Sequence, residues 1–241
     1  MNAECGTPQT LVCFALKEEA GAFRKLAGNS PGIRILLTGI GKKNAEKAVR
    51  DYLQKNTPLQ VFTCGFAGGL DPNLKIGDVV FLTVDSLVDK ALVEAGARPA
   101  SFYCAPHMVT TAKAKTELRE KTWASVVEME SVFIYQVCLE HNISCATVRV
   151  ISDVAEEDLP LDFNQLSNPN QSLNFGKLAW AVAKSPGKIP ALLRLQRNSK
   201  FAAERLATVL KKVIDQKLPP LERSSAAQPV PPSAPSSSRS R

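Results

Sequence analysis

Short apolar runs alternate with amphipathic stretches along the first 158 residues. Residues 10–16 form an apolar run typical of a buried strand, whereas residues 44–55 place Ala45 and Val49 on one helical face. The same two patterns predict further strands at 33–38, 59–64, 79–84, 102–104, 126–127 and 146–151, and further helices at 18–27, 87–95, 112–121 and 131–140. Such alternation favours a single-domain α/β fold with a mostly parallel central sheet and helices on both of its faces.

Residues 172–217 form a basic C-terminal segment. It follows a polar stretch, residues 162–171, that is expected to be a loop, and its pattern predicts helices at 173–184 and 190–217. Ten Lys and Arg stand in this segment against two acidic residues, so its charge of +8 exceeds the net charge of +7 of the whole chain. The second helix is amphipathic, which favours packing on the sheet or across a dimer over contact with a membrane surface.

The two ends of the chain lack the pattern of a folded element. Residues 1–9 are polar, without the features of a secretory signal, and are expected to be flexible. Residues 218–241 are rich in Pro and Ser and are expected to be disordered. The sequence has no apolar run of about 18 residues, the length that predicts a membrane-spanning helix. A single folded domain is therefore expected to span residues 10–217.

Composition narrows the functional classes. The 241 residues are 44% hydrophobic, enough for one sizeable core. The six cysteines form no C-x-x-C pair and only His107 and His141 are available, so we expect neither a metal site nor a disulfide framework, and no cofactor. Reduced thiols indicate the cytoplasm. The positive charge is concentrated in residues 172–217, whereas residues 1–171 carry a small net negative charge. A nucleic-acid partner is therefore not expected.

Acidic side chains stand where three predicted strands end. Glu19 follows the first strand, Glu128 and Glu130 follow the strand at 126–127, and Asp153 follows the strand at 146–151. Taken singly, acids at a helix start favour the helix dipole, and an Asp can cap a turn. In α/β sheets, however, ligands bind beyond the carboxyl ends of the strands. These carboxylates are therefore candidates for chemistry.

Two glycine-containing stretches also follow strands. G-F-A-G-G at 65–69 permits close approach of a ligand to the backbone, although a tight turn between strands explains it equally well. T-G-I-G-K at 38–42 matches neither the dinucleotide nor the P-loop pattern, so it predicts a turn and a helix N-terminus.

The order of these motifs resembles the nucleoside phosphorylase/nucleosidase superfamily, most closely the methylthioadenosine/S-adenosylhomocysteine nucleosidases. The resemblance covers roughly residues 10–158 and rests on T-G-I-G-K, G-F-A-G-G-L-x-P-x-L-K-I-G-D-V-V, V-E-M-E-S and V-I-S-D-V-A. The short segment 85–109 and the Asp-Leu-Pro after Ile-Ser-Asp are similar to hopanoid-associated phosphorylases, which are thought to remove adenine from a lipid-linked adenosine.

The resemblance implies a purine nucleoside N-glycosidase that releases adenine from an adenosine derivative and forms a homodimer. It implies that Asp153 protonates, or hydrogen-bonds to, the purine N7, and that Glu19 activates the attacking water. Substrate binding is expected from Glu130 at the ribose hydroxyls, Met129 beneath the sugar, and Glu128, Phe66, Ala67, Gly68 and His107.

Two alternatives stay open. The phosphorylases have an arginine just before the glycine-rich stretch; residues 59–63 have none, and Arg24 and Arg34 do not match the pattern. Water is therefore favoured over phosphate as the acceptor. The segment 85–109 is also shorter than the corresponding region of the family, which carries an aromatic residue that stacks on the purine. Stacking would then fall to His107 or Tyr103. The missing loop also leaves open a non-catalytic protein that binds nucleosides.

Overall fold

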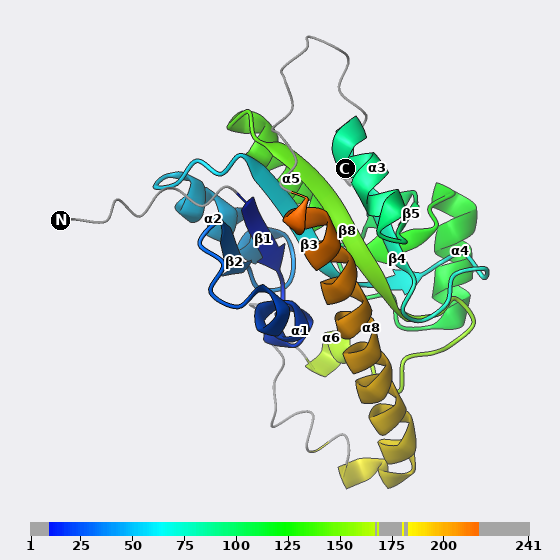
Figure 1. Cartoon of the computed structure of the whole chain (residues 1–241). Coiled ribbons are helices and arrows are strands. Elements are labelled where there is room, and N and C mark those ends of the chain that lie inside the picture. The colour runs from blue at the N-terminus through cyan, green and yellow to red at the C-terminus, as the bar shows by residue number, and fades with distance from the viewer. Residues whose placement is uncertain (1–9, 167, 169–179, 181–182, 217–241) are drawn as a thin grey trace, which may run out of the picture.

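The computed structural model describes residues 10–166, 168, 180 and 183–216. A mixed eight-stranded sheet lies at the centre with helices on both faces (Figure 1). The expected α/β fold with a mostly parallel sheet is confirmed. The strands are β1 (Thr10–Phe14), β2 (Ile33–Leu37), β3 (Gln60–Gly69), β4 (Val79–Leu82), β5 (Arg98–Pro99), β6 (Phe102–Cys104), β7 (Val126–Glu128) and β8 (Ser144–Asp153).

The sheet brings the carboxyl ends of three strands to one edge. Its main path runs β2-β1-β3-β8-β4-β5, and the pairs β1–β2, β1–β3 and β3–β8 are parallel. Strand β4 runs antiparallel to β8, and the end of β3 pairs antiparallel with β7, which is parallel to β6. The segments that follow β1, β3 and β8 therefore start from the same edge.

Helices cover the two faces in separate groups. One face packs against α1 (Lys17–Ala27), α3 (Ser86–Glu94) and α8 (Ile189–Asp215), around buried Phe23, Leu92 and Leu206. The other face packs against α2 (Lys42–Leu53) and α5 (Ser131–Glu140), around Val49 and Ile134. The further helical segments of the described residues are α4 (Ala112–Thr122), α6 (Phe163–Leu166) and a 3₁₀ turn η1 (Pro186–Lys188).

Helix α8 has two different halves. All of its buried residues lie between Ala202 and Val213, where it crosses the sheet beside α1. Its first half has no buried residue and extends beyond the sheet (Figure 1). For the second half, the interpretation as a helix packed on its own sheet is confirmed.

Several predicted boundaries were wrong. The G-F-A-G-G stretch is not a turn: β3 continues through Gly69 because its backbone pairs with β8 on one side and β7 on the other. Strand β8 likewise continues to Asp153. Helix α6 lies within residues 162–171, which were expected to be a loop, and β5 was not expected.

Some predictions fall on residues outside the described ranges, namely the flexible residues 1–9, the disordered residues 218–241 and most of the helix at 173–184. The helices that can be described include none long and apolar enough to cross a membrane. Five cysteines, Cys13, Cys64, Cys104, Cys138 and Cys145, are buried free thiols.

Candidate active site

Glu19 is a buried carboxyl held between a helix start and a strand. Its Oε2 accepts a 2.8 Å hydrogen bond from the Leu16 backbone, closing the first turn of α1. Its Oε1 accepts a 2.8 Å hydrogen bond from the Phe66 amide of β3. Burial raises the pKa of Glu19 above its usual value, although these two N–H groups act in the opposite direction. Glu19 therefore combines a fixed orientation with a proton affinity that is raised above that of a free carboxylate.

Gly65 makes room for this carboxyl. A β-carbon at Gly65 would lie 2.7 Å from Glu19 Oε1, too close for any side chain. The residue also has a φ of +155°, which side chains rarely adopt. The glycine is thus required by the close approach of Glu19 to β3.

Glu128 and Arg149 form a buried ion pair beneath the strand ends. Arg149 Nη2 donates to Glu128 Oε2 at 2.8 Å and to Thr63 Oγ1 at 3.2 Å. Glu128 also accepts hydrogen bonds from the Glu130 amide and from the amide and hydroxyl of Ser131, at 2.7–2.9 Å. Burial disfavours its charge, but Arg149 and these donors outweigh burial and lower the pKa of Glu128. Both carboxylate oxygens are therefore occupied by the protein's own donors.

Glu130 stands two residues further on in a different electrostatic environment. Its Oε1 accepts a 2.8 Å hydrogen bond from the Gly41 amide, in the T-G-I-G-K turn at the start of α2. Burial is the main cause that raises the pKa of Glu130 to about 8, and repulsion from Glu128 is the second. The predicted turn and helix N-terminus at 38–42 are confirmed, and their contact with Glu130 shows why they lie near the acids.

Asp153 ends β8 and is paired with a buried lysine. Lys115 Nζ, from α4, donates to Asp153 Oδ2 at 2.6 Å, and Ser152 Oγ donates to Oδ1 at 2.9 Å. Pairing with β3 passes from Ala67–Ile151 to Gly68–Asp153, so Ser152 is the extra residue of a β-bulge. A bulge re-aims the side chain that follows it. Asp153 is thereby directed to the same strand end as Gly68.

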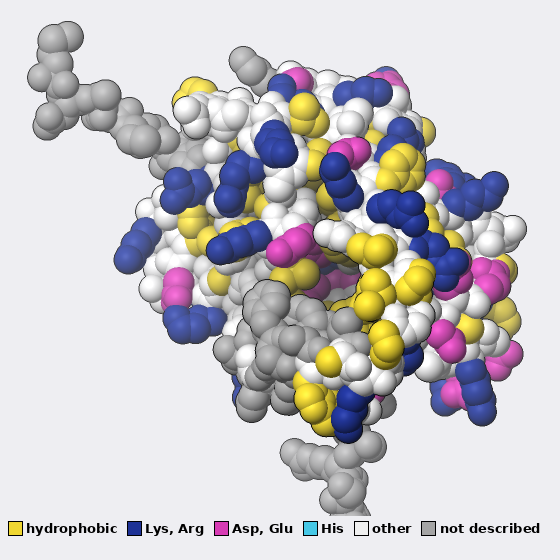
Figure 2. Space-filling model, turned by 90° about the horizontal axis from the view of Figure 1, so that it is seen from below, with side chains coloured by type: hydrophobic (Ala, Val, Ile, Leu, Met, Phe, Trp, Pro, Cys, Tyr) yellow, Lys and Arg dark blue, Asp and Glu magenta, His cyan; other side chains and the backbone are white. Residues whose placement is uncertain are grey.

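The end of β3 connects these groups. Phe66 contacts Glu19, and a β-carbon at Gly68 would lie 3.2 Å from Asp153 Oδ2. Phe66 and Gly68 are two residues apart on the strand, a span of about 7 Å. Viewed from the lower end of Figure 1, where α1 follows β1, the surface has a hollow with acidic side chains inside and hydrophobic side chains along one rim (Figure 2). We take this end of the sheet as the candidate site.

The other predicted binding residues vary in burial. Ala67 is buried, whereas Phe66, Gly68 and Met129 are half-buried at the strand ends. His107 is exposed, on a loop between β6 and α4. That loop is tied to the segment after β8, because Met108 exchanges hydrogen bonds with Asn164 at 3.0 and 2.8 Å.

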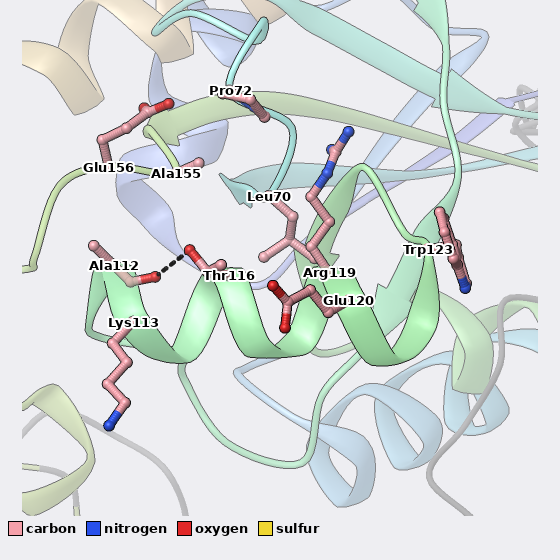
Figure 3. Close-up of a pocket in the computed structure, with 10 residues that line it drawn as sticks. All are labelled: Leu70, Pro72, Ala112, Lys113, Thr116, Arg119, Glu120, Trp123, Ala155 and Glu156. Atoms are coloured by element: carbon pink, nitrogen blue, oxygen red, sulfur yellow. Dashed lines mark hydrogen bonds between the residues drawn. The ribbon is translucent and has the colours of Figure 1, made fainter.

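A separate groove of about 780 Å³ lies between α4 and the segments that follow β3 and β8, which contribute Leu70, Pro72, Ala155 and Glu156. Its lining extends from Ala112 and Lys113 at one end of the helix to Trp123 at the other (Figure 3). Glu19, Glu130 and Asp153 are absent from this lining. The groove is therefore not the place where the acids could act together.

Sequence reasoning missed two charged residues of this site, Arg149 and Lys115. Arg149 had a signal, since a charge in the middle of a buried strand requires a partner. Lys115 had none, because α4 carries several similar lysines and only the fold shows that this one is buried.

Comparison with known proteins identifies the family. The phosphorylase superfamily model matches residues 19–85 and 85–184. A 5′-methylthioadenosine/S-adenosylhomocysteine nucleosidase from Glaesserella parasuis is 30% identical over 171 residues, covering 57% of this chain and 74% of the relative. The corresponding nucleosidase from a Shewanella species is 30% identical over 187 residues, covering 62% and 81%.

Solved structures share the fold. The futalosine hydrolase of Helicobacter pylori superposes with a TM-score of 0.65 at 18% identity, covering 87% of this chain and 98% of that one. A Neisseria meningitidis 5′-methylthioadenosine/S-adenosylhomocysteine nucleosidase in complex with methylthio-immucillin-A gives 0.64 at 20% identity, covering 86% and 99%. These relatives include no hopanoid-associated phosphorylase, so that part of the resemblance has no support from them. Because the family model matches more than half of the chain, this protein belongs to the phosphorylase superfamily.

Proposed function

We propose that the protein is a purine nucleoside N-glycosidase that releases adenine from an adenosine derivative of the methylthioadenosine/S-adenosylhomocysteine type. One observation carries the proposal: buried or half-buried acids from α1, β8 and the β7–α5 junction gather about the carboxyl end of β3, each held by a different partner. Relatives near 30% identity that are named as such nucleosidases support the same reaction.

Glu19 is proposed to act on the attacking water. It takes a proton from the water as the oxygen bonds to C1′ of the ribose and the C1′–N9 bond breaks. The raised pKa of Glu19 supports this role, because a general base works best when its proton affinity is matched to the pH of the reaction.

Glu130 is proposed to bind the ribose hydroxyls, with Met129 beneath the sugar. A pKa of about 8 leaves Glu130 mostly protonated at neutral pH. A protonated carboxyl both donates and accepts hydrogen bonds, as a pair of hydroxyl groups requires. Glu128, fully occupied by Arg149 and Ser131, is then suited to orienting this segment.

Asp153 is proposed to protonate, or hydrogen-bond to, the purine as it leaves. The electron pair of the C1′–N9 bond passes to the base, and a proton or hydrogen bond at N7 stabilises it. Phe66, Ala67, Gly68 and His107 are proposed to line the nucleoside site. Dimer formation and a cytoplasmic location remain parts of this proposal.

Water is favoured over phosphate as the acceptor. Arg24 and Arg34, the nearest candidates by sequence, are exposed on α1 and β2. Arg149 lies near the acids, but its Nη2 is paired with Glu128. Its Nε has no partner, yet the side chain is only 2% exposed, so little of it can meet an incoming phosphate. A site for a phosphate dianion would require cationic or N–H donors free to grip it.

The test is adenine release from methylthioadenosine, S-adenosylhomocysteine and adenosine, each with and without phosphate. The proposal predicts release that does not depend on phosphate. Strong phosphate dependence would assign the protein to the phosphorylases, and calorimetric binding of these nucleosides without product would indicate a non-catalytic binding protein.

A further inference from the structure

Lys115 is a lysine with no exposed surface, beside a group of the candidate site. Its side chain is fully buried, whereas the Asp153 side chain is 13% exposed. Besides Asp153 Oδ2 at 2.6 Å, its ammonium donates to the carbonyls of Val154 at 2.7 Å and Glu157 at 3.1 Å. An ammonium has three donors, so all of them are used within the protein.

This arrangement fixes the position of Asp153 and makes its carboxylate an acceptor towards Lys115. The two carbonyls hold the ammonium in place, and the ammonium holds one carboxylate oxygen. Because an ammonium can only donate, Oδ2 must accept at this contact. Lys115 also anchors residues 153–157, the segment that leaves the site after β8.

Both carboxylate oxygens of Asp153 accept hydrogen bonds from the protein. Each carboxylate oxygen has about two lone-pair positions, and Lys115 and Ser152 take one on each. Gly68 lets the β3 backbone pass close to Oδ2, since a β-carbon there would lie only 3.2 Å from it. The remaining positions therefore suit N–H donors of a ligand.

We propose that Lys115 is a positioning residue that keeps Asp153 an acceptor and thereby selects a 6-aminopurine over a 6-oxopurine as the leaving base. This inference rests on the proposed function. On the edge that includes N7, a 6-aminopurine offers an amino N–H, and its N7-protonated form offers a second donor. A 6-oxopurine offers an oxygen instead, which an anionic carboxylate repels, and Lys115 has no free N–H with which to bind it.

The proton balance requires no net proton from Asp153. Hydrolysis uses one water, whose oxygen and one hydrogen remain on C1′. The purine takes up a proton at N7 from solvent as the C1′–N9 electron pair passes to it, and the second hydrogen of the water balances that proton. Glu19 receives that second proton and releases it to solvent. Asp153 stabilises the N–H of the protonated base and ends each cycle in its starting state.

The test compares methylthioadenosine with methylthioinosine in the wild type and in Lys115→Met, which removes the charge while keeping a long apolar side chain. We expect the wild type to favour the 6-amino substrate in kcat/KM by about 10- to 100-fold. Lys115→Met should lower this ratio by about 10-fold or more, because Asp153 is then no longer held as an acceptor by a cation. Lys115→Arg, which retains a cation, should preserve the preference.

Lys113→Met is the matched control, because Lys113 lies on the same helix with an exposed side chain and should leave the ratio unchanged. An unchanged ratio in Lys115→Met would overturn the inference, since a merely structural role would lower both rates equally. Calorimetry of the wild type with adenine and hypoxanthine decides the case if the variant does not fold. Equal affinities would overturn the inference, whereas tight adenine binding without cleavage would contradict the proposed function alone.

Discussion

The amide of Phe66 on β3 donates a 2.8 Å hydrogen bond to Oε1 of Glu19 on α1, fixing a buried carboxyl against the middle of the glycine-rich strand. The two residues are 47 positions apart in sequence. The contact is possible because the preceding residue, Gly65, has no side chain. The acid and the G-F-A-G-G strand are thus one structural unit.

Gly65→Ala should disrupt this unit. Its β-carbon would lie 2.7 Å from Glu19 Oε1, so Glu19 or the strand must move. We expect a loss of about 1–3 kcal/mol in the free energy of unfolding, measured by urea titration, together with reduced adenine release. Gly32→Ala, which meets nothing within 4 Å, is the control and should change stability little. Equal behaviour of the two variants would show that Glu19 does not need this space.

Glu19→Gln should separate binding from turnover. The amide cannot take a proton from water, so kcat should fall about 100- to 10,000-fold while KM changes little. Steady-state adenine release gives both constants. Glu18→Gln changes the exposed neighbour and should retain normal activity. A loss confined to KM would instead assign Glu19 to substrate binding.

Glu130 should make stability depend on pH. Its pKa is raised from 4.5 to about 8, so the folded protein binds its proton more tightly than the unfolded chain does. This contribution is full below about pH 4.5 and is lost as the pH rises through 8. The free energy of unfolding should therefore fall by about 2–3 kcal/mol between pH 6 and 8.5 through this group. Glu130→Gln should remove that part of the slope, and an unchanged slope would contradict the assignment.

The Glu128–Arg149 pair should behave as a coupled unit. Arg149→Met leaves a buried carboxylate without its cation and should cost about 3–5 kcal/mol in the free energy of unfolding. Adding Glu128→Gln removes that charge, so the double variant should lose less than the sum of the single losses. The control is Arg50→Met with Glu140→Gln, a solvent-exposed pair whose loss should be small. Strict additivity for Glu128 and Arg149 would show that their charges are not coupled.

Much of this arrangement could be predicted from the sequence. Apolar runs of strand length located β1, β2 and β4, and acids directly after apolar runs located Glu19, Glu130 and Asp153. These signals are local, because a buried strand and the chain leaving it differ in polarity within one or two residues.

The remainder depends on contacts between distant segments. Glycines 65, 68 and 69 left a turn and a close approach to a ligand equally open, but pairing with β7 and β8 makes this stretch a strand. Lys115 resembles the other lysines of α4 until the fold buries it against Asp153. The division between a charged Glu128 and a largely protonated Glu130 likewise depends on Arg149, which comes from another strand.

Adenine release from methylthioadenosine by Asp153→Asn is the most direct test of the central claim, that Asp153 acts on the leaving base. The account predicts a loss of about 100- to 10,000-fold relative to the wild type, with methylthioadenosine still bound in calorimetry. Asp51→Asn, on the exposed surface of α2, should keep full activity. Full activity in Asp153→Asn would contradict the mechanism.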